Sequence, residues 1–254
     1  MLNISRRFSY YWLDTWVLAN VIQLATQDFC RKFLNLQNDP CGRQYDQMTQ
    51  AARSTTANIA EGNSRHATSR ETEMKLTDVA RASMAELAND YFNWLLQHGQ
   101  TPWSINDTNH KQLLKTNLDK PTYTDDVLHL SAEHILQQKS KYDTWLTTND
   151  SLTAARCLLV LCDKLIMMLN KQLEKQLASF TEEGGFTEAL TNVRLQHRAE
   201  ESLQEDAPLC PQCGKPMINA WRRKAPIPAS RSGAVPVTPI ATGRGKSNNV
   251  GITV

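Results

Sequence analysis

The chain lacks any long apolar segment. Its longest uninterrupted apolar run, residues 157–162, is far shorter than the stretch of about 20 residues that a membrane-spanning helix needs. Near the N-terminus, Asp14 interrupts the apolar stretch that follows Arg6 and Arg7, and no small-residue cleavage site comes after it. We therefore expect no signal peptide, no membrane association and a cytoplasmic protein.

Motifs that carry chemistry are also missing. The sequence shows no pairing of a nucleophile with a base, no glycine-rich phosphate loop and no paired carboxylates, so we expect neither catalysis nor a cofactor. His129 and His134 are five residues apart, whereas ligand pairs on one helical face stand three or four apart. The cysteines show no secreted disulfide pattern and are expected to be free thiols: Cys30, Cys41, Cys157, Cys162, Cys210 and Cys213.

Acidic residues are absent from the C-terminal part. Residues 207–254 hold 7 Lys and Arg and no Asp or Glu, while residues 1–206 hold 21 basic and 26 acidic residues, which gives +7 and −5. Seven of the ten prolines lie in this basic part, and it has no apolar periodicity. We therefore expect a folded region over 1–206 and a suffix over 207–254 that is disordered beyond about Met217.

Helical periodicity is what the folded region does contain. Four ranges carry it: 11–36, 40–62, 69–97 and 151–180. Between the last two, residues 99–150 predict an inserted loop followed by a helix over about 125–146, and a charged helix follows over about 187–204. The predicted fold is all-α, an antiparallel four-helix bundle with extra helices and a disordered C-terminal tail.

The 151–180 helix carries two adjacent apolar stripes. Such a helix is buried on more than one side, so it is either central in the bundle or in contact with another subunit. A four-helix bundle normally needs one such face per helix, which favours the subunit contact. The predicted oligomer interface is the second stripe: Leu158, Leu161, Leu165 and Met168.

The hairpin over 43–81 is the most informative stretch. Small residues give its first helix a face that a neighbouring helix can approach closely. Gly62 is placed as the left-handed stop of that helix, and Thr68 with Glu71 forms a predicted capping box at the start of the next helix.

The segments Gln50-Ala-Ala-Arg-Ser54 and Ala57-Asn-Ile-Ala-Glu-Gly62 resemble the signature of a family of small bacterial four-helix-bundle proteins. The family includes proteins encoded in intervening sequences of ribosomal RNA genes and accessory proteins of diversity-generating retroelements. The resemblance covers about 12–180, and one branch adds a cysteine-rich suffix. It implies a ring-like homo-oligomer, a pentamer where known, that binds RNA or a reverse-transcriptase-type partner without catalysis.

Basic residues on the hairpin are the candidates for binding nucleic acid: Arg43, Arg53, Arg65, Arg70, Lys75 and Arg81. The excess over acids in this stretch is one charge, so surface ion pairs are the competing interpretation. RNA binding requires that Arg53 and Arg65 stay unpaired. The alternative function is a protein–protein interaction module without nucleic-acid contact.

The suffix begins with half of a zinc ribbon, in which Cys210 and Cys213 stand on a knuckle opened by Gly214. A structural zinc site needs four ligands, and the sequence has no cysteine or histidine after Cys213. We therefore expect the half site to be empty, with zinc bound only if a second ligand pair is supplied.

We predict that the residues after about Met217 are read in a shifted frame, which would account for the missing pair. By resemblance, related suffixes continue to Phe-Trp-Gly-Cys and a further cysteine. Residues 231–235 can be encoded CGT TCT GGG GCT GTC, whose frame from the third base reads Phe-Trp-Gly-Cys, and a second cysteine can follow within 236–241. We expect the gene to carry such codons, and the corrected protein to hold about one zinc ion per chain by elemental analysis while the present chain holds little. Codons over 231–241 that cannot encode this segment would refute the shift.

Overall fold

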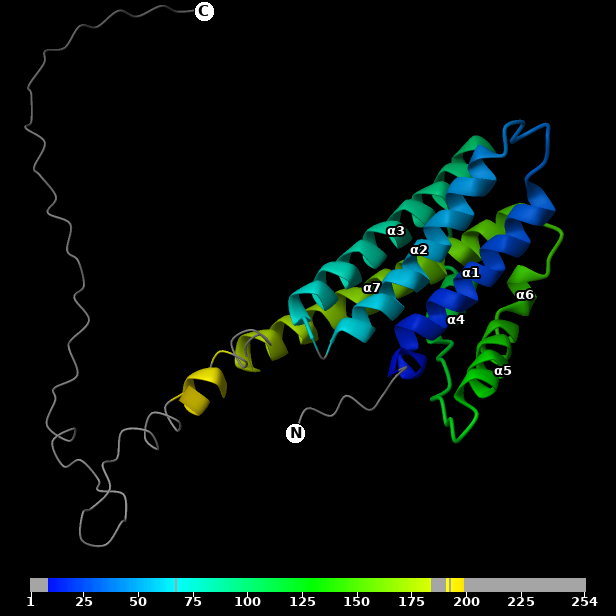
Figure 1. Ribbon diagram of the computed structural model, residues 1–254. Coiled ribbons are helices and arrows are strands. Elements are labelled where there is room, and N and C mark those ends of the chain that lie inside the picture. Colours follow the sequence, from blue (N-terminus) through cyan, green and yellow to red (C-terminus); the bar gives the residue numbers. More distant parts are fainter. Residues whose placement is uncertain (1–8, 67, 184–190, 192, 199–254) are drawn as a thin grey trace, which may run out of the picture. The chain divides into compact units, whose positions relative to one another are not determined.

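The structure, a computed structural model, describes residues 9–66, 68–183, 191 and 193–198, and within these ranges it is helical and has no strand. The elements are η1 (Ser9–Trp12), α1 (Asp14–Phe33), α2 (Arg43–Arg65), α3 (Arg70–Gln97), α4 (Thr108–Lys115), α5 (Val127–Ser140), α6 (Asp143–Leu146) and α7 (Ser151–Glu183) (Figure 1). The all-α class is confirmed. These elements belong to the first of two units into which the chain divides, residues 1–197.

Part of the sequence-based organisation lies outside the described residues. This is so for Cys210, Cys213 and the suffix that contains them. Of the predicted charged helix, residues 191 and 193–198 are described and are helical. None of the helices in the described ranges combines the length and the apolarity that a membrane crossing requires.

Four long helices share one hydrophobic core. α1 packs on α2, α2 on α3, α3 on α7 and α7 on α1, so each contacts two neighbours in cyclic order (Figure 1). We call α1, α2, α3 and α7 the four-helix core. Its largest fully buried side chains come from all four helices and include Leu18, Ile22, Met48, Leu87, Tyr91 and Leu161.

α7 is covered by other helices on several sides. It packs on α1 and α3 and also on α4 and α6, which explains why the sequence gives it two apolar stripes. Leu158, Leu161 and Leu165 have no exposed surface within the single chain, and Met168 is partly buried against the same core. The assignment of the three leucines to an oligomer interface is therefore wrong, because nothing of them remains to contact another subunit.

Gly62 brings α2 and α3 together and does not end a helix. α2 continues to Arg65, and Gly62 does not have a positive φ. A Cβ atom at Gly62 would lie 3.2 Å from the carbonyl oxygen of Glu73 and 3.2 Å from the Cβ of Leu76. The glycine is thus required by the close approach of the two helices.

The caps of the hairpin also differ from the prediction. α3 begins after Ser69, whose Oγ accepts the Thr72 N–H at 3.2 Å. Thr68 instead donates to the carbonyl of Arg65, and Glu71 pairs with Lys75, so the predicted capping box is wrong by one residue. Neither Thr68 nor Glu71 occupies the N-cap position of α3, which Ser69 takes.

At its other end α2 starts later than the sequence predicts. Gly42 adopts a left-handed conformation with φ of 66°, and the helix begins at Arg43 rather than near Pro40. The carboxylate of Asp39 reaches past the turn and accepts the N–H groups of Gln44 at 3.2 Å and Tyr45 at 2.9 Å. Asp39 therefore caps the helix from outside it.

The insertion folds against two sides of the four-helix core. α4, which the sequence did not predict, packs on α7, where the Lys164 ammonium donates to the carbonyl of Thr116. α5 packs on α1, and Lys139 pairs with Asp28 at 3.0 Å. The predicted 125–146 helix is interrupted between α5 and α6, and Tyr142, in the interruption, is fully buried.

Substituting Gly62 tests the close approach of α2 and α3. We expect Gly62→Leu to lower the free energy of unfolding by about 1–3 kcal/mol, since the added side chain meets backbone at 3.2 Å. The loss outweighs the gain of up to about 1 kcal/mol from replacing a helix-interior glycine. Ala57→Leu, at an exposed position on α2, is the control and should change little. Equal urea midpoints for the two variants would contradict this packing.

Candidate functional site

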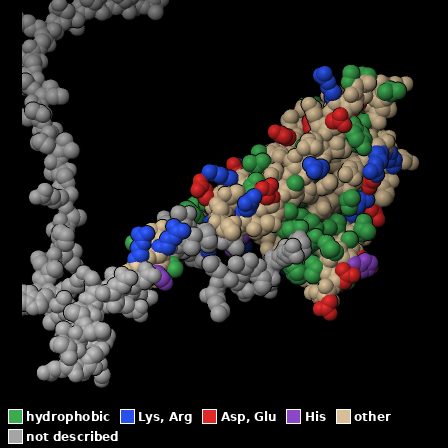
Figure 2. All heavy atoms as spheres, in the orientation of Figure 1, with side chains coloured by type: hydrophobic (Ala, Val, Ile, Leu, Met, Phe, Trp, Pro, Cys, Tyr) green, Lys and Arg blue, Asp and Glu red, His purple; other side chains and the backbone are tan. Residues whose placement is uncertain are grey.

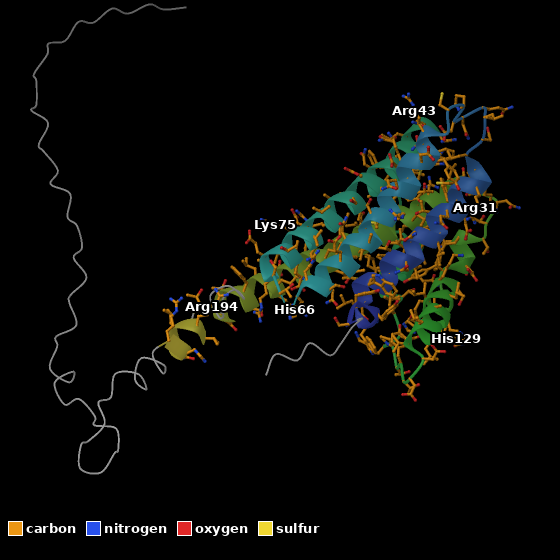
Figure 3. All side chains as sticks on the ribbon, in the orientation of Figure 1. Arg31, Arg43, His66, Lys75, His129 and Arg194 are labelled. Carbon is orange, nitrogen blue, oxygen red and sulfur yellow. The ribbon has the colours of Figure 1, made fainter. Side chains whose placement is uncertain are left out.

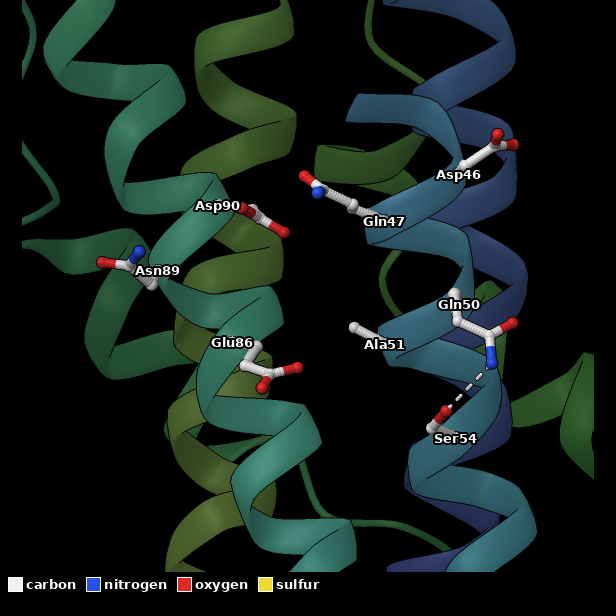
Figure 4. A pocket seen from close by; sticks show the side chains of 8 residues that line it. All are labelled: Asp46, Gln47, Gln50, Ala51, Ser54, Glu86, Asn89 and Asp90. Carbon is white, nitrogen blue, oxygen red and sulfur yellow. Dashed lines mark hydrogen bonds between the residues drawn. The ribbon is translucent and has the colours of Figure 1, made fainter. Parts of the chain in front are cut away.

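A groove runs between α2 and α3 on the outside of the four-helix core. It has a volume of about 620 Å³ and is lined by residues of both helices: Asp46, Gln47, Gln50, Ala51, Ser54, Glu86, Asn89 and Asp90 (Figure 4). Ala51 is the small residue at its floor, being almost fully buried, while the polar lining side chains surround it. The groove opens where Ala51 and Ser54 supply little side-chain volume.

The groove is acidic. Asp46, Glu86 and Asp90 line it, and no lysine or arginine does. Burial raises the pKa of the Asp90 carboxyl, and the negative charge of Glu86 raises it further. A ligand that places a cation here would relieve both effects, because it would replace lost solvation and screen the repulsion.

The amides and the hydroxyl of the groove add hydrogen-bonding capacity. Gln50 donates to Ser54 at 3.4 Å, a long and therefore weak bond that a ligand can replace. Gln47 and Asn89 each present a donor and an acceptor from opposite helices. The lining can therefore bind a cationic group through carboxylates and a peptide-like group through amides.

The groove also contains part of the signature segment. Gln50, Ala51 and Ser54 line it, whereas Ala52 and Ile59 of the same segment are buried in the core. From the sequence we predicted only that these small residues let a neighbouring helix approach closely. That reading holds near Gly62, but at Ala51 and Ser54 the same small residues leave a hollow.

Four of the six predicted nucleic-acid-binding residues already have side-chain or backbone partners. Arg65, which the RNA-binding hypothesis requires to be unpaired, lies 3.8 Å from Glu61, so that requirement is not met. The other contacts are Lys75 with Glu71 at 2.7 Å, Arg81 with Asp78 at 2.5 Å, and Arg70 donating to the Ser179 hydroxyl at 2.8 Å. The ion pairs neutralise part of the positive charge that would attract a phosphate, and the hydrogen bond of Arg70 occupies a donor that a phosphate would use.

Arg43 and Arg53 are exposed and form no ion pair within the described ranges. They stand ten residues apart on α2, which is about 15 Å along the helix. Figure 3 shows Arg43 near one end of the four-helix core and Lys75 well away from it along α3. The structure thus spreads the six basic residues over two helices and does not gather them into one patch, and their contact with nucleic acid stays a prediction.

The histidines and cysteines of the described part show no converging metal ligands, since no group of three His, Cys, Asp or Glu side chains comes together there. His129 pairs with Glu133 at 3.2 Å. Cys157 and Cys162 are fully buried small core residues, as predicted, and burial raises the pKa of the Cys30 thiol to about 12.

Comparison of the chain with protein-family models, curated proteins and solved structures finds no match.

Neutralising Asp90 tests the electrostatics of the groove. A carboxyl whose folded-state pKa is raised costs stability when ionised, and the cost disappears as the pH falls through that pKa. We expect Asp90→Asn to raise the thermal midpoint at about pH 7 and to raise it less at about pH 4. Asp46→Asn, at an exposed position of the same groove, should have a smaller effect. If the thermal midpoints of Asp90→Asn and the wild type are equal at both pH values, the ionised Asp90 carboxylate does not destabilise the fold, and the expectation is contradicted.

Proposed function

We propose that the protein is a non-catalytic, self-assembling adaptor of the four-helix-bundle family, and that the groove between α2 and α3 binds a basic segment of a protein partner. The single observation that carries the proposal is a groove lined by three carboxylates, by no lysine or arginine, and by Gln50, Ala51 and Ser54 of the signature segment. Its volume suits a few side chains of a partner rather than a whole helix. The antiparallel arrangement and the cytoplasmic location inferred from the sequence belong to the same proposal.

Charge favours a protein over RNA as the occupant of this groove. Phosphates would be repelled by Asp46, Glu86 and Asp90, whereas arginine and lysine side chains form charge-assisted hydrogen bonds with carboxylates. A reverse-transcriptase-type partner, which the family resemblance implies, has this chemistry because proteins that hold nucleic acid carry clustered basic residues.

RNA binding is a second candidate, favoured by a different observation. Arg53 is exposed and has no ion pair in the described ranges, and the suffix over 207–254 carries seven basic residues and no acid. Such a contact would depend on salt and tolerate many sequences, since phosphates rather than bases would be recognised.

Binding of labelled oligomers to the full chain tests the two candidates together. The probes are a fluorescent arginine-rich peptide and a fluorescent RNA of similar length, followed by anisotropy. We expect the variant Asp46→Asn, Glu86→Gln, Asp90→Asn to weaken peptide binding by about tenfold or more, since it removes the charge-assisted bonds. The same variant should leave RNA binding equal or tighter.

The control variant removes three other carboxylates from α2 and α3, in Glu61→Gln, Glu71→Gln and Asp78→Asn. It changes the net charge equally but lies outside the groove. Equal weakening by both variants would show that the peptide responds to net charge alone, against the proposal. Arg53→Glu separately tests the RNA candidate and should weaken only RNA binding.

A further inference from the structure

A second hollow lies beside α4, in the insertion between α3 and α7. Its volume is about 470 Å³, which is in the range of small-molecule sites. The residues that line it include two lysines and, among the described residues, no acid, so its charge is opposite to that of the groove between α2 and α3. We call it the α4 hollow, and its lining consists of Asn106, Thr108, Lys111, Gln112, Lys115 and Thr116.

The two lysines of the α4 hollow differ from the other lysines of the insertion. Residues 99–150 contain five lysines, and three of them form ion pairs: Lys120, Lys139 and Lys141 with Asp14, Asp28 and Asp119, in that order. Lys111 and Lys115 are exposed and form no ion pair with a described residue. They stand four residues apart on one face of α4, where their charges repel each other. An anion bound between them would remove this repulsion.

The carbonyl groups at the end of α4 do not oppose an anion, because they are already bonded. The last carbonyls of a helix carry partial negative charge. Here Lys164 of α7 donates to the carbonyls of Leu114 and Thr116, and the N–H and hydroxyl of Thr116 donate to the carbonyl of Gln112. Lys164 thus places a third ammonium group beside the α4 hollow.

α4 is held in an orientation that keeps its lysines exposed. Leu113, two residues from each lysine and therefore on the other side of the helix, is fully buried. Trp145 Nε1 donates to the side chain of Asn109 at 3.0 Å. Asp107 caps the first turn by accepting the Asn109 N–H at 2.7 Å, and it does not line the hollow. A helix of two turns is marginal alone, so these contacts preorganise the lining.

The lining suits a phosphate group with a polar body attached. Lysine ammonium groups bind phosphate as point charges, and two lysines four residues apart can reach the same group. The amides of Asn106 and Gln112 and the hydroxyl of Thr108 add both donors and acceptors. The volume exceeds what a lone inorganic ion fills. A nucleotide meets both requirements, since its phosphate fits the lysines and its sugar and base can bond to the neutral groups.

We infer that the α4 hollow binds the phosphate group of a nucleotide through Lys111 and Lys115. The phosphate belongs either to a free nucleotide or to a nucleotide of an RNA strand, which present the same chemistry. The site involves neither the acidic groove nor the basic residues of the hairpin. It therefore stands whether or not the proposed partner groove is correct.

Titration of the ¹⁵N-labelled full chain with adenosine monophosphate tests the site, followed by the side-chain amide signals of Asn106 and Gln112. We expect saturable shifts with a dissociation constant on the order of millimolar or lower, and none with adenosine, which lacks the phosphate. Lys111→Ala with Lys115→Ala should raise the dissociation constant about tenfold or more, because both charge-assisted bonds are lost. Lys111→Arg with Lys115→Arg should retain binding, and circular dichroism checks that every variant keeps its helix content.

The matched control is Lys171→Ala with Lys175→Ala. These lysines are also exposed and four residues apart, but they lie on α7 and outside the hollow. The control should change the dissociation constant by less than about twofold, since exposed charges outside a site contribute little. No saturable shift up to about 10 mM nucleotide, equal shifts with adenosine, or equal effects of the two alanine variants would overturn the inference.

An oligoadenylate of about eight nucleotides without terminal phosphates identifies the source of the phosphate. If Lys111→Ala with Lys115→Ala weakens the shifts caused by both probes, the hollow accepts a strand. If it weakens only those caused by the mononucleotide, the ligand is a free nucleotide, and weakening of neither would overturn the inference. The groove variant Asp46→Asn, Glu86→Gln, Asp90→Asn should leave mononucleotide binding unchanged, so the two sites are tested separately.

Discussion

Burial of α7 on several sides is the constraint on which the rest of the structure depends. Its leucines at 158, 161 and 165 have no exposed surface, and they contribute to a core shared with α1 and α3. Full burial of a leucine is worth about 1.5–3 kcal/mol, so a helix with several of them fixes where its neighbours lie. The insertion completes this burial, since α4 and α6 cover the part of α7 that the other long helices leave open. A surface contact between subunits must therefore use other residues.

The sequence predicted the long helices well because apolar periodicity records which face is buried. It predicted less well the points where packing and local geometry decide. Gly62 resembles a helix stop in sequence, but only the distance to Glu73 and Leu76 shows that the glycine serves helix contact. Ser69 and Thr68 are both good caps, and the choice between them depends on where the turn places each hydroxyl. The two apolar stripes of α7 allowed two interpretations, and burial by the insertion, which has weak periodicity of its own, decided between them.

The candidate site was harder to predict than the fold because charge pairing depends on geometry. Counting charges over 43–81 gives a small basic excess. In the structure, however, Arg65, Lys75 and Arg81 form ion pairs with acids three or four residues away. Glu86 and Asp90 lie on α3 beyond the hairpin segment, and they line one groove with Asp46 because α2 and α3 pack against each other. The hairpin therefore has an acidic opening despite its composition. The one sequence signal for the groove was the pair of small residues Ala51 and Ser54. Small residues on α2 have two different effects: near Gly62 they allow close contact with α3, whereas at Ala51 and Ser54 they leave a hollow.

The packing order of the helices determines which side of the four-helix core stays open. The four long helices follow the cyclic order α1, α2, α3, α7, and α5 packs on α1, whereas the groove lies between α2 and α3. The insertion packs on α1 and α7 and therefore leaves the acidic lining of the groove open. A partner segment with several basic side chains, as proposed, gains from three carboxylates in one groove, because after the first charge pair forms each further pair is an intramolecular contact.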